Sequence, residues 1–277
     1  MSVVQKALWS IERNLKGDLS LSAVAQAAGV SRHHLVHAFG AATGVAPMTY
    51  VRRRRLSEAA KALTNGAHDI LPVALDAKYE SQEAFSRAFK DEFGVTPGDV
   101  RKAGLTSLRL TAPLAFSPEK QTALTPPRFV SAGPLILVGL IERQSLGRVE
   151  TIPTQWGDFM QSYEEVADVA DEIPVGVSFI PDDEGAFDYA CAVIVGRADS
   201  IPAGLKRIDL PKQEYALFEH AGHVSTIHNT YLAIWDQGVD GRDLADAPSL
   251  EKHKPAFNTR TGMGGVEIWI PLEHRAS

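Results

Sequence analysis

Residues 31–47 read SRHHLVHAFGAATGVAP, and residues 81–97 read SQEAFSRAFKDEFGVTP. Aligned without a gap, the two stretches repeat their apolar and turn positions. The identical pairs are Ser31/Ser81, Ala38/Ala88, Phe39/Phe89, Gly44/Gly94, Val45/Val95 and Pro47/Pro97, with Leu35/Phe85 as a further apolar match. A repeat of this kind indicates one supersecondary unit that the chain uses twice. Because several positions between the repeated ones differ, the sequence predicts one scaffold with two different exposed surfaces.

Each copy supplies the second helix of a predicted helix-turn-helix. In the first copy a short helix ends at Gly29, and Ser31 caps the next helix. In the second copy a helix over residues 71–77 and a turn precede the helix that Ser81 caps. A longer helix over residues 47–64 joins the copies, and at about 1.5 Å per residue it spans roughly 25 Å. This is the scale needed to place two helices in successive major-groove turns, about 34 Å apart.

The outward faces of the two repeated helices carry the side chains that differ. In the first copy these are Arg32, His33, Val36, His37 and Gly40. In the second copy they are Gln82, Glu83, Ser86, Arg87 and Lys90. Gln and Arg can bond adenine and guanine edges in a bidentate manner, and Glu can accept from cytosine. Both faces are therefore predicted to read DNA, and the second copy is predicted to carry more of the sequence specificity.

Two features of this region have alternative explanations. The four arginines at 52–55 could contact DNA or form a solvated helix face, and one helix cannot turn all four to the same side. His33, His34 and His37 could bind a metal ion, but no cysteine or carboxylate accompanies them. Arg87 stands at the position that matches His37, which favours DNA contact. We therefore predict no metal site.

Length and charge divide the chain into two parts. Its 277 residues are enough for two domains with separate cores. Residues 1–110 contain 15 Lys and Arg against 10 Asp and Glu, whereas residues 111–277 contain 13 against 24. A basic part suits a polyanion and an acidic part does not. The single cysteine, Cys191, excludes an internal disulfide, and no apolar run reaches membrane-spanning length, so we expect a cytoplasmic protein.

The second part of the chain has the pattern of strands. Four prolines in residues 111–127 indicate a linker. The predicted elements beyond it are a strand at 135–141, a helix at 154–171, a hairpin over 175–180 and 187–195, a strand segment at 206–222, a helix near 225–237, a loop, and a strand at 266–271. We interpret them as two βαββ units packed as an α+β domain. The expected boundaries are a DNA-binding domain at 1–108, a linker at 109–127 and a second domain at 128–277.

Candidate chemistry in this second domain lies on strands. In VEIWIP (266–271), alternation places Glu267 and Trp269 on one face, where a carboxylate beside an aromatic ring could attract a lipophilic cation. The same Glu could simply lie on a solvated sheet face. The stretch FEHAGH (218–223) is not HExxH and is typical of a hydrogen-bonded turn. The sequence has no phosphate-binding loop, dinucleotide fingerprint or nucleophile elbow, so we expect no cofactor.

The first part resembles the DNA-binding domain of AraC/XylS-type transcription regulators over about residues 1–105. The resemblance rests on LSLSAVAQAAGVSRHHLVHAFGAATGVAP, YVRRRRLSEAAKAL and ESQEAFSRAFKDEFGVTPGDVRK. It implies that the major grooves are faced by Arg32, His33, Val36, His37, Gln82, Glu83, Ser86 and Arg87. Two departures stand out. Lys78 replaces a usual glycine, and His33, Val36 and His37 replace the Trp, Gln and Arg of some members.

The second part resembles the GyrI-like effector-binding domain over about residues 130–274. The resemblance rests on LILVGL, GVSFIPDDEGAFDYACAV, YALFEHAGHVSTI and GGVEIWIPL. Domains of this type bind small, often cationic and lipophilic molecules between two pseudo-symmetric halves, with a central glutamate. The resemblance implies that Glu267 has this role. It further implies that Trp156, Tyr163, Tyr189 and Trp269 line the pocket, although each could equally be a core residue.

These observations predict a multidomain transcription regulator, not an enzyme, whose second domain senses a small molecule. The expected partners are double-stranded DNA, a small-molecule effector and RNA polymerase, with no membrane. Two alternatives concern the GyrI-like part. It could hydrolyse small molecules, with Glu267 and Tyr189 acting on bound water. It could instead be a protein-interaction module that sequesters the DNA-binding domain.

Overall fold

In the computed structural model of the chain, the two repeated stretches form helices that start and end in the same way. Ser31 Oγ and Ser81 Oγ each accept a hydrogen bond of 3.1 Å from the backbone N–H three residues later. Both helices end at a glycine with positive φ, 73° at Gly44 and 75° at Gly94. This left-handed conformation favours glycine, which explains why both copies retain it. The structure describes residues 2–65, 67, 69–103, 108–114, 123–146, 151–182, 184–239, 241–258 and 261–273.

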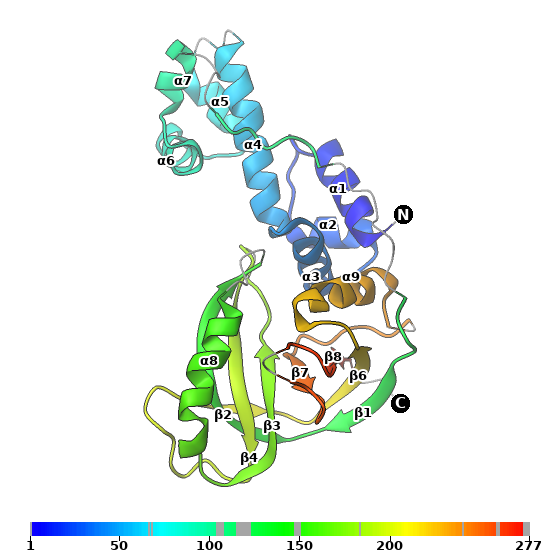
Figure 1. Cartoon of the computed structure of the whole chain (residues 1–277). Coiled ribbons are helices and arrows are strands. Elements are labelled where there is room, and N and C mark those ends of the chain that lie inside the picture. Colours follow the sequence, from blue (N-terminus) through cyan, green and yellow to red (C-terminus); the bar gives the residue numbers. More distant parts are fainter. Residues whose placement is uncertain are drawn as a thin grey trace.

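Seven helices build the N-terminal part of the described chain, and α4 joins its two halves (Figure 1). They are α1 (Val3–Arg13), α2 (Leu21–Ala28), α3 (Arg32–Thr43), α4 (Pro47–Thr64), α5 (Ile70–Asp76), α6 (Gln82–Phe93) and α7 (Pro97–Ala103). Helices α2 and α3 form the first helix-turn-helix, and α5 and α6 form the second. The repeated aromatic residues Phe39 and Phe89 are both fully buried. The two predicted helix-turn-helix motifs are thus confirmed.

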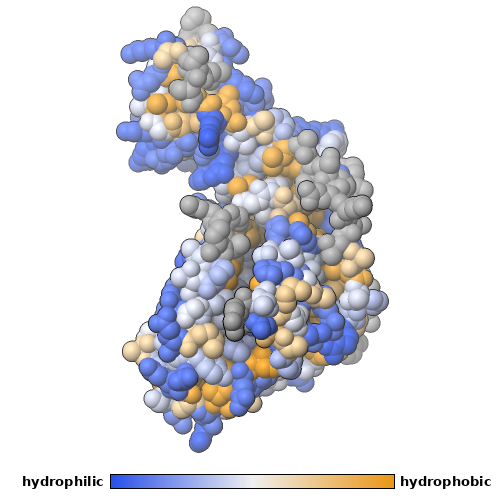
Figure 2. All heavy atoms as spheres, in the orientation of Figure 1, coloured by the Kyte–Doolittle hydropathy of each residue, from blue (hydrophilic) through white to orange (hydrophobic). Residues whose placement is uncertain are grey.

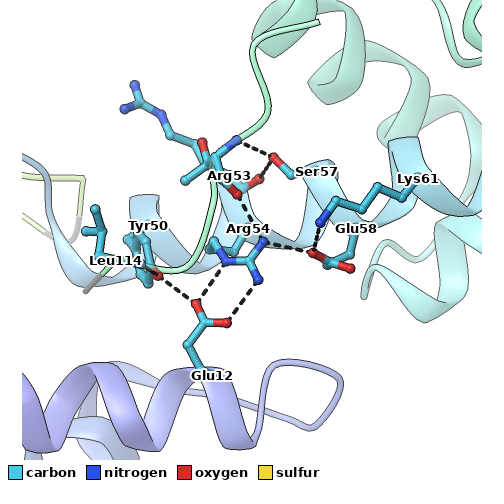
Figure 3. Close-up of polar contacts among 9 residues, drawn as sticks. Glu12, Tyr50, Arg53, Arg54, Ser57, Glu58, Lys61 and Leu114 are labelled. Carbon is cyan, nitrogen blue, oxygen red and sulfur yellow. Dashed lines mark hydrogen bonds and ion pairs between the residues drawn. The ribbon is translucent and has the colours of Figure 1, made fainter. Parts of the chain in front are cut away.

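Arg54 holds α4 against α1. It is only 3% exposed, and its guanidinium donates to both carboxylate oxygens of Glu12 at 2.9 Å and to Glu58 at 3.0 Å (Figure 3). The next residue, Arg55, donates to the backbone carbonyls of Leu15 and Gly17. Bidentate Arg–carboxylate pairs fix geometry as well as charge. Two of the four consecutive arginines therefore have a structural role in joining the helices.

Part of the predicted linker lies along α4. The Thr111 N–H donates to Ser57 Oγ at 2.9 Å, and the Leu114 N–H donates to the Tyr50 hydroxyl at 3.0 Å. Tyr50 and Ser57 both lie on α4, and the contacts with Tyr50 and Ser57 appear in Figure 3. Residues 115–122 of the predicted linker lie outside the described residues.

Eight strands form one antiparallel sheet in the described C-terminal part. They are β1 (Arg128–Ala132), β2 (Leu135–Ser145), β3 (Val169–Ser178), β4 (Ala186–Val195), β5 (Lys206–Leu210), β6 (Gln213–His220), β7 (Ser249–His253) and β8 (Val266–Leu272). Their order is β1-β6-β8-β7-β3-β4-β2-β5. With α8 (Ile152–Ser162) and α9 (Ile227–Gln237), two units appear, β2-α8-β3-β4 and β6-α9-β7-β8. The predicted pair of βαββ units is confirmed, and the units meet where β3 pairs with β7.

Three predicted elements differ from the structure. The segment at 206–222 divides at Pro211 into β5 and β6, because proline cannot donate to a strand ladder. The predicted loop before residue 266 contains the short strand β7, whose sequence SLEKH has no clear apolar alternation. The helix predicted to end at residue 171 ends at Ser162, followed by a 3₁₀ turn over Tyr163–Glu165 and then by β3.

The first helix-turn-helix and the C-terminal domain share one hydrophobic core. Trp235 and Ile234 of α9 belong to the same cluster as Leu35 and Phe39 of α3. The second helix-turn-helix has a core of its own around Phe89. Figure 2 shows it as a separate lobe that stands away from the rest of the molecule. Within the described residues, no helix combines the length and apolarity required to cross a membrane.

Candidate functional site

The outward face of α6 is open to solvent. Gln82, Glu83, Arg87 and Lys90 are exposed, and Ser86 is half-buried. These side chains lie opposite the buried Phe85 and Phe89, which anchor the helix on its own lobe. The structure therefore brings together the five residues predicted for the second DNA-reading surface on one accessible face of α6. A helix presented in this way can enter a major groove.

The turn before α6 has an unusual backbone. Lys78 has a φ of 67°, close to the 77° of Gly29 in the first copy. Its N–H donates to the Leu75 carbonyl, as the Gly29 N–H donates to the Gln26 carbonyl. Lys78 thus performs the turn that glycine makes in the first copy, although a Cβ disfavours this conformation. The departure noted in the sequence leaves the turn geometry intact.

The outward face of α3 is largely covered. Arg32 is exposed, but His33 and Val36 are only 5% and 3% exposed. The His37 ring stacks on Trp235 of α9, with centroids 4.7 Å apart and planes 19° from parallel. Of the four residues predicted to read DNA, Arg32 is exposed, Val36 is buried, and His33 and His37 lie against Trp235 of α9. Burial lowers the pKa of His33 to about 4.

The five residues predicted to bind the effector do not form one cluster. Ile268 and Ile270 of β8 pack in the core that contains α9. By strand alternation, Glu267 and Trp269 point to the opposite face of the sheet. There the Glu267 carboxylate accepts a hydrogen bond of 2.7 Å from Arg128.

Tyr189, Trp156 and Tyr163 belong to the core beneath α8, on the helix-covered face. This placement separates Glu267 from Tyr189. The hydrolytic pair proposed from the sequence is therefore not formed, because the two side chains lie on opposite faces of the sheet.

Glu251 of β7 occupies the position between the two units. Its carboxylate accepts hydrogen bonds of 2.8 Å from Tyr189 of β4 and from Tyr231 of α9, one tyrosine from each unit. No Lys or Arg forms an ion pair with Glu251 among the residues that the structure describes. Burial raises the pKa of Glu251 above its ordinary value, although both tyrosine hydrogen bonds oppose this effect. The site is therefore a carboxylate that forms no ion pair with Lys or Arg in the described part of the chain.

Gly176 of β3 makes this arrangement possible. It pairs directly with Glu251, and a Cβ at position 176 would lie 2.2 Å from the Tyr189 hydroxyl oxygen. No side chain fits there, so the Tyr189 phenol can cross β3 to reach the neighbouring strand. Any larger residue at position 176 would displace this hydroxyl.

Further aromatic side chains pack against one another near the two tyrosines. The Trp156 ring of α8 lies 5.2 Å from the His253 ring of β7, and His253 stacks on Phe257 at 4.0 Å. Tyr231 stacks on Trp235 at 6.4 Å. The Tyr163 hydroxyl donates to the Glu172 carbonyl and not to Glu251. Buried tyrosine hydroxyls and ring faces around a carboxylate suit an aromatic or lipophilic cation.

Sequence reasoning missed Glu251 because it missed β7. The five residues SLEKH were assigned to a loop, and Glu251 was not considered. The repeat of the βαββ unit contained the necessary signal. A second unit with the order of the first requires a strand between α9 and β8, and only this segment could supply it. The two tyrosines also come from distant parts of the chain, which no local pattern connects.

The N-terminal and C-terminal parts of the chain match two different kinds of domain. Residues 24–103 match a helix-turn-helix domain, and residues 125–273 match the GyrI-like small molecule binding domain. The chain is 29% identical over 289 residues to transcriptional regulator Rob of Salmonella typhimurium, with 98% of each chain covered. It is 27% identical over 285 residues to the right origin-binding protein of Escherichia coli K12, again with 98% of each covered.

A shorter relative matches the N-terminal part alone. HTH-type transcriptional activator AarP of Providencia stuartii is 35% identical over 114 residues, which cover 40% of this chain and 84% of that protein. Two of these three relatives are thus a transcriptional regulator and a transcriptional activator. The chain therefore belongs to the GyrI-like family, as a DNA-binding transcription regulator of the AraC type with a GyrI-like small-molecule-binding domain.

Proposed function

We propose that the chain regulates transcription by reading two successive major-groove segments, with its activity adjusted by a lipophilic cation bound at Glu251. The observation that carries the ligand class is the Glu251 carboxylate, which Tyr189 and Tyr231 hold and with which no Lys or Arg pairs among the described residues. Taking a charge out of water is costly unless an opposite charge accompanies it. A ligand that brings its own positive charge and an apolar body relieves this cost.

The DNA part of the proposal is supported by the α6 face. Arg87 can bond a guanine in a bidentate manner, and Gln82 can do the same with adenine. The rigid helix α4, fixed by Arg54, sets the separation between α6 and α3. Sequence selection from a random DNA pool, followed by gel shifts, tests this reading. Arg87→Ala should weaken the selected site by about 1–3 kcal/mol, or roughly 5- to 150-fold. If no DNA motif is enriched, the DNA part of the proposal fails.

Calorimetry with two ions of nearly equal size tests the ligand class. Tetraphenylphosphonium is a lipophilic cation, and tetraphenylborate is its anionic counterpart. We expect the protein to bind the cation and not the anion. Glu251→Gln should weaken cation binding about 100-fold, since one partner of a desolvated charge pair is removed.

Glu267→Gln is the matched control, because Glu267 already pairs with Arg128 on the opposite face of the sheet. This variant should bind the cation as the unmodified chain does. The reverse outcome, loss in Glu267→Gln and retention in Glu251→Gln, would restore the site predicted from the sequence and refute Glu251.

A further inference from the structure

The difference between the two repeated helices has a structural counterpart. Position 40 is Gly in the first copy, where the second copy has Lys90. Residues 33, 36 and 37 are likewise less polar than Glu83, Ser86 and Arg87. In the structure the α6 face is open and the α3 face is covered. The composition of the α3 face is therefore that of a contact surface between domains.

The first contact is made by α9. Trp235 is 1% exposed and packs against three histidines of α3. It stacks on His37, its ring centroid lies 5.7 Å from that of His34 and 6.3 Å from that of His33, and its backbone carbonyl is hydrogen-bonded to His34 Nε2. His33 and His37 are further joined through their Nε2 atoms at 3.0 Å.

The second contact comes from the other βαββ unit. A Cβ at Gly40 would lie 2.4 Å from Leu146 Cδ1, so a larger residue at position 40 would displace the Leu146 side chain. Just beyond α3, the Cβ of Ala46 lies 3.0 Å from the position that a Cβ would take at Gly185. Leu146 follows β2, whereas Trp235 lies on α9, so α3 is held by both units of the effector domain.

A short path joins this contact to the Glu251 site. The Tyr231 hydroxyl donates to Glu251 Oε1, the Tyr231 ring stacks on Trp235, and Trp235 stacks on His37. Tyr231 and Trp235 are one helical turn apart on α9, so they share a face. Two ring contacts, Tyr231 with Trp235 and Trp235 with His37, thus connect the Tyr231 side chain to the α3 surface. Packed side chains in such a series can couple two sites when one element has two arrangements.

We propose that the effector domain closes over α3 and excludes its face from DNA, and that cation binding at Glu251 favours release of α3 by freeing Tyr231. This inference rests on the proposed function, because it assigns a regulatory role to the same site. A major groove cannot accept His33 and His37 while Trp235 packs against them, and Val36 is buried as well. In the closed state α6 reads DNA alone. Two-segment reading requires α3 to leave α9.

A reversible disulfide tests the closed state in the full chain. Leu146 Cγ lies 3.1 Å from the Cβ position of residue 40. A cysteine Sγ occupies the γ position, and a disulfide places each Cβ about 3 Å from the partner sulfur. The double variant Gly40→Cys/Leu146→Cys should therefore form a cross-link under mild oxidation. The native Cys191 is buried, and each single variant serves as a control for oxidation alone.

We expect the oxidised double variant to bind its selected DNA at least tenfold more weakly, with a footprint reduced to one groove segment. Reduction should restore both properties, which excludes misfolding as the cause. A cross-linked protein with full affinity and a two-segment footprint would overturn the proposal. Failure of the two cysteines to cross-link would also overturn it, because α3 would then not rest against Leu146.

The same samples separate this inference from the proposed function. If the reduced protein binds no specific DNA sequence, the proposed function itself is refuted. If the reduced protein binds DNA normally and the cross-link changes nothing, only the closure of α3 is refuted. The variant Tyr231→Phe keeps the ring and removes the hydroxyl. Without cation, it should bind DNA as tightly as the unmodified chain binds DNA with saturating tetraphenylphosphonium.

Discussion

Lys78 has a left-handed backbone conformation, which is unfavourable for residues other than glycine. Its φ of 67° places it in the left-handed region, at a turn where the first copy has Gly29. The Lys78 ammonium pairs with Asp18 at 3.0 Å, but Asp18 is exposed, and such surface pairs contribute little. The conformational cost therefore outweighs what the side chain gains.

Lys78→Gly should accordingly stabilise the protein by roughly 1 kcal/mol, since the left-handed conformation costs an L-residue about 1–2 kcal/mol. Thermal unfolding should then shift upward by about 2–4 °C for a chain of this size. Asp18→Ala is the control, because it removes the ion pair and leaves the turn unchanged. An unfolding temperature that falls in Lys78→Gly would contradict this account.

The Glu251 carboxylate lowers the folding stability of the protein and at the same time provides the proposed cation site. Burial raises the pKa of Glu251, so the folded state holds this proton more tightly than the unfolded state. The folded protein is then favoured most below the ordinary Glu pKa of 4.5, and the advantage is lost as the pH rises through the raised pKa. Above the raised pKa the ionised carboxylate destabilises the fold unless a cation is bound.

We therefore expect Glu251→Gln to unfold at higher urea than the unmodified chain at pH 8. The difference should shrink toward pH 4.5, where the carboxylate of the unmodified chain is protonated in the folded state. Urea denaturation at the two pH values provides the measurement. Glu267→Gln should show no such gain, since its carboxylate is already paired. Equal midpoints for Glu251→Gln and the unmodified chain at pH 8 would refute the argument.

At the scale of elements, α3 and α6 share a scaffold and differ in what covers them. Their caps, terminal glycines and inward residues match, because both must pack on a preceding helix and end in a tight turn. Their outward faces differ because α6 meets only solvent before DNA arrives, whereas α3 meets α9. This difference explains the histidines of α3, because a histidine can be buried in its uncharged form.

The contact between α3 and α9 should weaken in acid. Burial lowers the pKa of His33 to about 4 and also lowers those of His34 and His37. Asp246 acts on His33 and Asp236 on His34, and both carboxylates oppose this effect without overcoming it. The closed state therefore binds fewer protons than an open one. Its stability is complete above about pH 6.5 and falls as the pH drops toward 4.

Small-angle scattering should show a larger radius of gyration at pH 5.5 than at pH 7.5, because α3 separates from α9. The oxidised Gly40→Cys/Leu146→Cys protein is the control and should keep the same radius at both values. Expansion of both proteins would indicate general loosening in acid. An unchanged radius in the unmodified chain would show that these histidines do not control the contact.

For the whole molecule, the sheet and α9 connect two binding events. The two βαββ units meet at the β3–β7 pair, where Glu251 lies, and each unit also contacts α3. A ligand that prefers one arrangement of the units must shift the population of that arrangement. Linkage then requires that DNA changes the affinity for the cation by the same factor as the cation changes the affinity for DNA.

We expect tetraphenylphosphonium to bind the DNA complex more tightly than the free protein, by about 5- to 150-fold. Gel shifts at saturating cation should show an equal gain in DNA affinity. Tyr231→Phe should reduce both factors together, since it interrupts the path to Trp235. Equal cation affinities with and without DNA would show that the two sites are independent.

The local architecture could be predicted from the order of residues. Caps, terminal glycines and apolar spacing depend on neighbours within one or two turns, and these predicted both helix-turn-helix motifs and most strands. They also identified the α6 face, because an exposed helix face needs no distant partner. The same local reasoning could not find β7, a short strand without apolar alternation that exists only because β3 and β8 flank it.

Two features depend on contacts between distant segments of the chain. They are the identity of the carboxylate between the two units and the covering of α3. Glu267 and Glu251 look alike in the sequence, yet Arg128 pairs with one and two tyrosines from separate units hold the other. The histidines of α3 point away from the core of their own helix-turn-helix but are buried in the whole molecule. They are covered by α9, which follows about 200 residues later in the sequence. Burial and ion pairing are set by such distant contacts, which the order of residues does not display.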